Sequence, residues 1–179
     1  LVKGVRAVGG IAGWVTTGQV NNCYNIKTIV IGTDMYIGGI TGGANNTIIG
    51  CENRGTVTGK GNNVGGIAGY SSITIAGCKN SGTVNGEGKQ VGGIVGFAQS
   101  TITECENKGV VTGKGSNVGG IAGGVRSAID GCNNNGTVNG EGAEVGGIAG
   151  FTNSTMFSCN NTGTIIGTGE NVGGISGAS

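Results

Sequence analysis

Apolar residues recur along this chain in one pattern with a period of about 27 residues. Its clearest element is the hexapeptide Val-Gly-Gly-Ile-Ala-Gly at 64–69, and lightly varied copies begin at Val8, Ile37, Val91, Val118, Val145 and Val172. Successive starts are evenly spaced from Ile37 onward, whereas the first interval, from Val8 to Ile37, contains two extra residues. A fixed period of this length is typical of solenoids, in which each repeat covers the apolar faces of its neighbours. We therefore expect residues 1–179 to form a single repeat domain.

Within one repeat, taken as residues 64–90, the apolar positions predict three short strands separated by turns rich in glycine and asparagine. The expected strands are 64–68, 73–78 and 83–85. Val64 and Ile67 differ in parity, so the Gly65–Gly66 pair is expected to form a bulge or corner that lets both side chains point inward. Each coil would then supply about five inward groups to a thin core.

Stacking strands about 4.8 Å apart turns each position of the repeat into a column. The inward column of the second strand is expected to be Val20, Ile48, Ile75, Ile102, Ile129 and Met156. The inward column of the third strand is expected to be Ile29, Val57, Val84, Val111, Val138 and Ile165. The sequence thus predicts an all-β fold, a parallel β-solenoid with three short strands per coil and about six to seven coils, right-handed by the crossover rule. Two extra residues of the first repeat are expected in loops, one before Cys23 and one between Cys23 and Ile37.

Each repeat carries one cysteine, and an asparagine follows it two residues later. The columns are Cys23, Cys51, Cys78, Cys105, Cys132 and Cys159, and Asn25, Asn53, Asn80, Asn107, Asn134 and Asn161. The cysteines are interpreted either as inert buried thiols or as cross-links or metal ligands. In-register Cβ atoms about 4.8 Å apart exceed the usual disulfide range of about 3.5–4.5 Å, which favours inert thiols. The asparagine amides are expected to hydrogen-bond up the stack and to cap turn carbonyls.

Charged residues alternate in sign from coil to coil. One column reads Lys60, Glu87, Lys114 and Glu141, and another reads Glu52, Lys79 and Glu106. Like charges stacked at the coil spacing would repel each other, so the alternation is expected to fix the register. We predict a structural role for both columns.

The composition argues against catalysis and against several kinds of binding site. The chain has no histidine, and its two aspartates, Asp34 and Asp130, stand alone, so general acid–base pairs are poorly supplied. No glycine-rich segment completes a phosphate-loop or dinucleotide motif. We expect no catalytic residues, no cofactor and no metal site. A net charge of +1 with interleaved signs does not favour nucleic acid, and no apolar run is long enough for membrane insertion.

The elements Val-Gly-Gly-Ile-x-Gly, Cys-x-Asn-x-Gly-Thr-Val and Gly-x-Gly together resemble the GLUG repeat family over residues 8–177. The resemblance implies a repeat region of large bacterial cell-surface or secreted proteins, sometimes accompanying immunoglobulin-A-cleaving metallopeptidases, and hence an extracellular or cell-surface location. The metal-binding helix of those peptidases is absent from this sequence, so the resemblance implies no catalytic role. Both ends of the sequence resemble parts of a coil, which predicts a fragment of a longer array whose open coil ends could stack end to end.

Three classes of function fit this pattern. The first is a stalk or adhesin rod that touches carbohydrate or protein, and the second is a self-assembling fibre subunit. The third is an ice- or crystal-surface-binding solenoid using the outward residues Thr56, Thr58, Thr83, Thr137 and Thr164, although Asn85, Val110, Asn139 and Ile166 interrupt the array. A separate candidate for surface recognition is the aromatic set that directly follows the hexapeptide, Trp14, Tyr70, Phe97 and Phe151. Exposed in a row, these rings would stack on sugars; otherwise they cover the end of the core.

Overall fold

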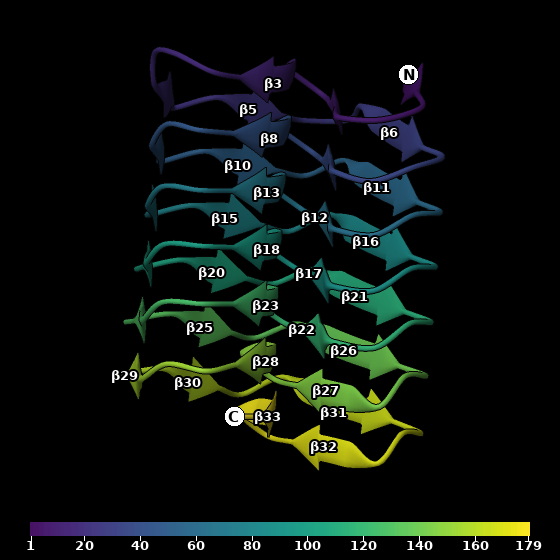
Figure 1. The fold of residues 1–179 in the computed structure, drawn as a ribbon, viewed down its shortest axis with the longest axis vertical. Coiled ribbons are helices and arrows are strands. Elements are labelled where there is room, and N and C mark those ends of the chain that lie inside the picture. The colour runs from purple at the N-terminus through teal and green to yellow at the C-terminus, as the bar shows by residue number, and fades with distance from the viewer.

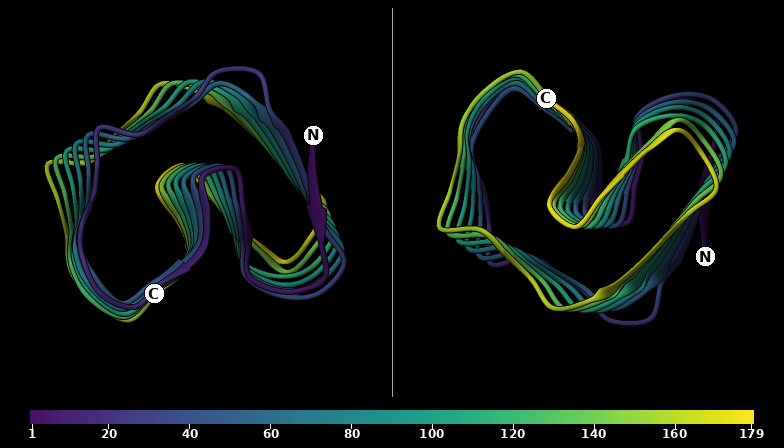
Figure 2. Two further views of the ribbon diagram at one scale, coloured as in Figure 1. Left: turned by 90° about the horizontal axis from the view of Figure 1, so that it is seen from above. Right: turned by 90° about the horizontal axis from the view of Figure 1, so that it is seen from below.

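Equivalent residues of successive repeats lie directly above one another in this protein. The computed structural model describes residues 1–179 and consists of short strands joined by turns, stacked in about seven coils (Figure 1). Every strand pair is parallel, and Val64, for example, lies opposite Ile37 in one neighbouring coil and Val91 in the other. The predicted all-β parallel solenoid with about 27 residues per coil is confirmed, and all three predicted strand segments of the coil are present. In Figure 2, seen from above, the chain runs clockwise as it leaves the N-terminal coil, which makes the solenoid right-handed.

The strands belong to five parallel sheets, numbered here in chain order from the start of the hexapeptide. Sheet 1 contains β2 (Val8–Gly9), β7 (Ile37–Gly38), β12 (Val64–Gly65), β17 (Val91–Gly92), β22 (Val118–Gly119), β27 (Glu144–Gly146) and β32 (Asn171–Gly173). Sheet 2 contains β3 (Ala12–Val15), β8 (Thr41–Ala44), β13 (Ala68–Ser71), β18 (Val95–Ala98), β23 (Ala122–Val125), β28 (Ala149–Thr152) and β33 (Ser176–Ala178). Sheet 3 contains β4 (Val20–Asn21), β9 (Ile48–Ile49), β14 (Ile75–Ala76), β19 (Ile102–Thr103), β24 (Ile129–Asp130) and β29 (Met156–Phe157).

The last two sheets complete the coil. Sheet 4 contains β5 (Tyr24–Asn25), β10 (Glu52–Asn53), β15 (Lys79–Asn80), β20 (Glu106–Asn107), β25 (Asn133–Asn134) and β30 (Asn160–Asn161). Sheet 5 contains β1 (Val2–Gly4), β6 (Ile29–Gly32), β11 (Thr56–Gly59), β16 (Thr83–Gly86), β21 (Val110–Gly113), β26 (Thr137–Gly140) and β31 (Thr164–Gly167). All three predicted segments of the repeat therefore contain strands. The first is divided by a corner into β12 and β13, and the two-residue strand β15 was not expected.

The corner at Gly65–Gly66 folds the wall of the solenoid inward, and Figure 2 shows the indented outline that results. Glycine is required here because the backbone approaches its neighbours closely. A Cβ atom at Gly66 would clash with the carbonyl oxygen of Gly93, and one at Gly69 would clash with the backbone of Tyr36 and Ile37 in the preceding coil. The hexapeptide thus allows sheets 1 and 2 to pack back to back across the indentation.

The indentation separates two apolar cores instead of leaving one. Val64 lies in the smaller core, which the valine columns of sheets 1 and 5 fill, whereas Ile67 lies in the larger core, which sheets 2 and 3 line. Both residues are fully buried, as expected for a corner at Gly65–Gly66, but they point into different cores. The other expected inward groups of this coil, Ile75, Cys78 and Val84, are also fully buried.

The asparagine column faces the corner and hydrogen-bonds along the rod. Each amide nitrogen donates to the amide oxygen of the next coil at 2.8 Å, from Asn25 to Asn161. In the central coil, the amide of Asn80 also donates to the carbonyl of Gly82 at 3.2 Å. The predicted ladder is therefore present, and it satisfies the buried amides themselves and the carbonyl of the turn that follows.

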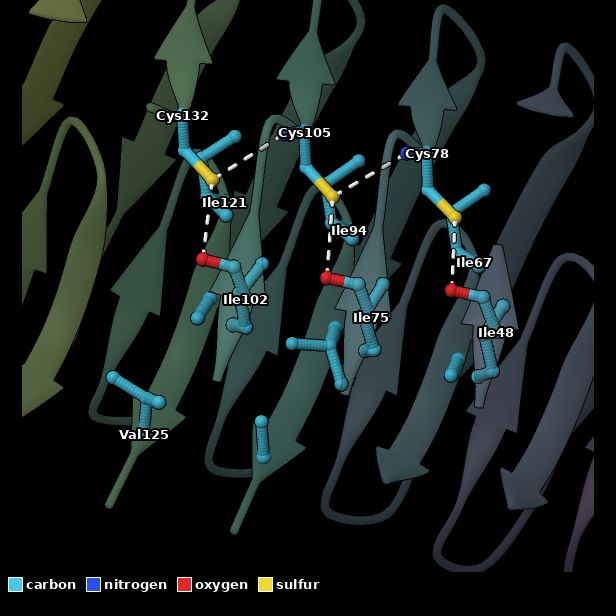
Figure 3. Close-up of a cluster of buried hydrophobic side chains, with 14 of the residues drawn as sticks. Ile48, Ile67, Ile75, Cys78, Ile94, Ile102, Cys105, Ile121, Val125 and Cys132 are labelled. Carbon is cyan, nitrogen blue, oxygen red and sulfur yellow. Dashed lines mark hydrogen bonds between the residues drawn. The ribbon is translucent and has the colours of Figure 1, made fainter. Parts of the chain in front are cut away.

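The cysteine column lies in the larger core, where the three central thiols, those of Cys78, Cys105 and Cys132, contact rows of isoleucine (Figure 3). All six cysteines are free thiols. The backbone N–H of Cys78 donates to the sulfur of Cys105 at 3.4 Å, and the N–H of Cys105 donates to the sulfur of Cys132 at the same distance. The thiol of Cys105 donates to the carbonyl of Thr103 at 3.2 Å. Each central thiol is thus held by the coil that precedes it and by the turn of its own coil.

One predicted column was wrong in the first repeat. Val57 pairs with Val30, and Ile29 pairs with Thr56, so Val30 is the buried member of the column while Ile29 is 47% exposed. The reason is the position of the second extra residue, which lies between Asn25 and Ile29. Asn25 pairs with Asn53 of the next coil, and the same spacing would place Ile29 opposite Val57. Ile29 instead pairs with Thr56, one residue earlier. The other extra residue lies in the loop at 16–19, as expected.

Candidate functional site

The charged column of sheet 4 is in register, but its ion pairs form within coils. Glu52 lies opposite Lys79, and Lys79 lies opposite Glu106. The bonded partners are Arg54 for Glu52, at 2.7 Å, and Lys108 for Glu106, at 3.1 Å. Hydrogen bonding from Arg54 is the main cause that lowers the pKa of the Glu52 carboxyl. The second column keeps the order Lys60, Glu87, Lys114 and Glu141, through backbone hydrogen bonds to sheet 5, and it forms no ion pair.

The outward face of sheet 5 carries the threonines considered for ice binding. Its two columns are Ile29, Thr56, Thr83, Val110, Thr137 and Thr164, and Ile31, Thr58, Asn85, Thr112, Asn139 and Ile166. Isoleucine, valine and asparagine break both rows, and Ile166 is 54% exposed. A continuous threonine array is therefore absent from this face.

A groove runs along the indentation and is the most distinctive surface of the molecule. It has two adjoining hollows of about 480 Å³ and 420 Å³. Aromatic and amide side chains line the first, together with one guanidinium: Trp14, Tyr36, Asn45, Asn63, Tyr70, Gln90, Phe97, Gln99 and Arg126. The second shares Gln90, Phe97 and Arg126 with the first and adds Lys89, Ser116, Asn117, Glu144 and Phe151. We call this surface the aromatic groove.

Its aromatic rings are stacked along the rod. The rings of Trp14 and Tyr70 lie 5.8 Å apart with an interplanar angle of 14°, although Gly43 occupies the coil between them. A Cβ atom at Gly43 would clash with the indole, so glycine makes the room into which the Trp14 ring leans. Phe97 continues the stack, 6.4 Å from Tyr70. Burial raises the pKa of the Tyr70 hydroxyl, and the nearby Tyr36 adds to the effect.

Each end of the aromatic cluster is covered by an arginine. The guanidinium of Arg126 lies 5.4 Å from the ring centroid of Phe97, and that of Arg6 lies 5.4 Å from the ring centroid of Tyr36. Tyr36 itself packs edge-on against Trp14 at 5.5 Å. Neither arginine forms an ion pair with a carboxylate of the chain. Both cations therefore keep N–H groups available beside the groove.

The opposite wall of the groove is a column of residues with left-handed backbone. Tyr36, Asn63, Gln90 and Asn117 occupy the same position in four successive coils, with φ between 63° and 67°. This conformation costs a residue with a Cβ about 1–2 kcal/mol, and glycine would avoid that cost. Asn63 is 8% exposed, and its amide donates to the amide oxygen of Gln90 at 2.9 Å. Four successive coils thus carry a side chain at a position where the backbone conformation favours glycine.

The structure brings together three of the four aromatic residues that the sequence singled out. Trp14, Tyr70 and Phe97 are in one stack, whereas Phe151 lies apart in the second hollow, on the other side of Gly124 from Phe97. The rings line the groove outside both cores. Tyr36 and Arg126 were missed by sequence reasoning. Tyr36 lies directly before the hexapeptide, and Arg126 lies two residues after the position of the aromatic set. Both positions hold different residue types from repeat to repeat, so the period did not draw attention to them.

Comparisons with known proteins show a relationship in fold. No protein-family model matches the chain, and no curated protein matches its sequence. Among solved structures, it is similar to a putative immunoglobulin A1 protease from Bacteroides ovatus, determined at 1.30 Å resolution, with a TM-score of 0.67 and 21% sequence identity. The similarity covers 93% of this chain and 66% of that protein, so the chain spans just under two thirds of its neighbour's length. The structure contains no helix that is long and apolar enough to cross a membrane.

Proposed function

We propose that this chain is a non-catalytic, rigid repeat region of a bacterial surface or secreted protein, in which it acts as a stalk or adhesin rod. The observation that carries this proposal is the unbroken stacking, because sheets 1, 2 and 5 pair in register through seven strands each. Two cores and the asparagine ladder run through the same coils. A stack joined by five sheets resists bending, which suits an element that holds other parts of a longer protein apart.

The placement of the reactive side chains supports a non-catalytic role. The central thiols are buried and hydrogen-bonded inside the larger core, and the two ion pairs lie on the surface of sheet 4. No three or more histidine, cysteine, aspartate or glutamate side chains are grouped so that they could hold a metal ion. The Bacteroides ovatus neighbour is described as a protease, but at 21% identity the similarity concerns the fold, so we do not assign proteolysis to this chain.

Membership of the GLUG repeat family and an extracellular or cell-surface location belong to the same proposal. The three glycines of the hexapeptide have separate structural tasks at the corner, and this explains why a motif of this kind recurs once per coil. The location rests on the sequence resemblance.

A lengthened rod tests the proposal. Two copies of residues 1–179 joined through a copy of residues 153–163 would complete one coil at the junction and keep the register. Small-angle X-ray scattering should show an unchanged cross-section and a doubled length compared with the single chain. A second junction, in which a flexible glycine–serine linker replaces 153–163, serves as the control. Scattering from two independently moving bodies in both fusions would contradict a rigid rod.

Electron microscopy across a concentration series addresses the fibre alternative. Isolated short rods at every concentration are expected for a stalk. Long fibres of uniform width would instead favour self-assembly through the coil ends, with the second copy as the partner.

Purified chain is also expected to leave immunoglobulin A1 intact over a long incubation, and cleavage that survives repurification would overturn the non-catalytic role.

A further inference from the structure

We propose that the aromatic groove binds an acidic polysaccharide laid along the rod, with Arg126 contacting the anionic groups of its sugars. This inference does not depend on the stalk role, because a rod with an empty groove would still act as a spacer. It rests on three features of the groove: unpaired cations, amide side chains that face solvent, and walls whose backbone groups are already hydrogen-bonded.

The charge of the groove favours an anion. The first hollow contains Arg126 and no carboxylate, and the second contains Lys89 and Arg126 against the single carboxylate of Glu144. None of these three residues takes part in an ion pair. The guanidinium of Arg126 lies over the ring of Phe97, which holds the group in place, and it forms no ion pair with a carboxylate of the chain. A planar fork fixed in this way matches a carboxylate or a sulfate.

The amide side chains favour a ligand rich in hydroxyl groups. Asn45 and Gln99 are exposed on one wall, and Gln90 is half-buried on the other. An amide offers both donors and acceptors, as a sugar hydroxyl does, so the two groups can satisfy each other fully. The left-handed position supports this use, because Tyr36 and Gln90 keep large side chains at a place where glycine would relieve backbone strain.

The backbone of the groove walls argues against an extended peptide. The N–H of Asn63 donates to the carbonyl of Lys89 at 2.9 Å, and the N–H of Gln90 donates to that of Ser116 at 3.0 Å. The walls therefore present no unpaired strand edge to which a peptide strand could be added. Recognition must come from side chains, whose positions recur at the coil spacing although their types differ from coil to coil, and a polymer of repeating sugar units suits such a surface.

Isothermal titration calorimetry with defined polymers tests the inference. The probes are polygalacturonate, as a carboxylated polymer, chondroitin sulfate, as a sulfated one, and fully methyl-esterified polygalacturonate, as the uncharged counterpart of the first. We expect at least one acidic polymer to bind and the methyl ester to bind far more weakly. Arg126→Gln should weaken binding about tenfold, as the loss of a charge-assisted hydrogen bond does. Lys114→Gln removes the same charge from an exposed residue outside the groove and should change the affinity less than about twofold.

Several results would overturn the inference. These are no binding of either acidic polymer, equal binding of the methyl ester, or equal losses in Arg126→Gln and Lys114→Gln, which would indicate nonspecific attraction. Equal binding of poly-glutamate would show that charge alone is recognised. Tyr70→Ala provides a second readout within the groove, because it removes a ring of the stack without changing charge and should also weaken binding. Circular dichroism of each variant verifies that the fold is retained.

Discussion

The indole of Trp14 reaches across Gly43 to stack on the ring of Tyr70, with 5.8 Å between the ring centroids, although the two residues belong to coils that are not adjacent. A residue without a side chain in the middle coil is what lets the two rings meet. The absence of a side chain at Gly43 thus decides that the rings of the two flanking coils come into contact.

Replacing Gly43 with alanine is expected to displace the indole. The new Cβ atom would clash with the Trp14 ring, and the ring must swing into solvent. Trp14 is the only tryptophan, so its fluorescence emission should shift to longer wavelength while circular dichroism stays unchanged. Gly174→Ala is the matched control, because a Cβ atom there meets nothing within 4 Å. Identical emission spectra for both variants would contradict the stacked arrangement.

Removing one rung of the asparagine ladder should destabilise the fold. Asn80→Ala takes away the acceptor of the Asn53 amide and the donor to Asn107, both at 2.8 Å and both buried. Leaving buried polar groups unsatisfied costs about 1–3 kcal/mol each, so we expect urea unfolding to show a loss of at least about 2 kcal/mol. Asn85→Ala is the control, since this half-buried side chain on sheet 5 forms no hydrogen bond. Equal stability of the two variants would mean that the ladder is not a major contribution.

The thiol of Cys105 is expected to resist alkylation even in mildly alkaline solution. Contacts with the thiols of Cys132 and Cys78, together with burial, hold the pKa of Cys105 well above its usual value of 9.0. A raised pKa means that the thiol keeps its proton as the pH passes 9, so the reactive thiolate does not form. Mass spectrometry after iodoacetamide treatment at pH 7 to 10 should show Cys105 unmodified in native protein and modified in urea.

The half-exposed Cys23 is the internal control for that experiment and should react in the native protein. Modification of Cys105 at the rate of Cys23 would show that the core opens readily. Three stoichiometric disulfides after denaturing alkylation would instead overturn the assignment of free thiols.

Reversing one charge in sheet 4 should produce a salt-dependent loss of stability. Lys79→Glu would place three carboxylates in line, because Glu52 and Glu106 are the register partners of Lys79 on either side. The midpoint of urea unfolding should fall at low ionic strength and recover in about 1 M salt, where the Debye length is about 3 Å. Lys79→Gln isolates the loss of attraction from the gain of repulsion and should have a much smaller effect. A decrease that is independent of salt would point to a packing defect.

The repeat made most of the fold predictable. Val57, Val84 and Val111 recur at one spacing, and parallel strands repeat the same contacts at each step, so the period alone identifies which residues lie above one another. The prediction failed at Ile29 because an insertion shifts the register by one residue, and nothing local in the sequence distinguishes Ile29 from Val30 as the buried member. The ladder of asparagines could be predicted for the same reason as the valine column.

The candidate site was predictable only in part. Trp14, Tyr70 and Phe97 stand out in the sequence because they occupy one position of the repeat, but Tyr36 and Arg126 occupy others and reach the groove from its other wall and from beside the stack. Periodicity determines the order of residues along the rod. It does not determine which walls of one coil face each other.

The sequence by itself determined the period, the strands and the columns of buried valine, isoleucine, cysteine and asparagine, because a parallel stack repeats every contact at a fixed interval. Only the tertiary structure decided the cross-section. The chain can turn at Gly66 because that residue has no side chain: a Cβ atom there would clash with the carbonyl oxygen of Gly93 and with the side chain of Asn80. That one corner divides the interior into two cores and, on the outside, creates the groove in which Arg126 meets Phe97.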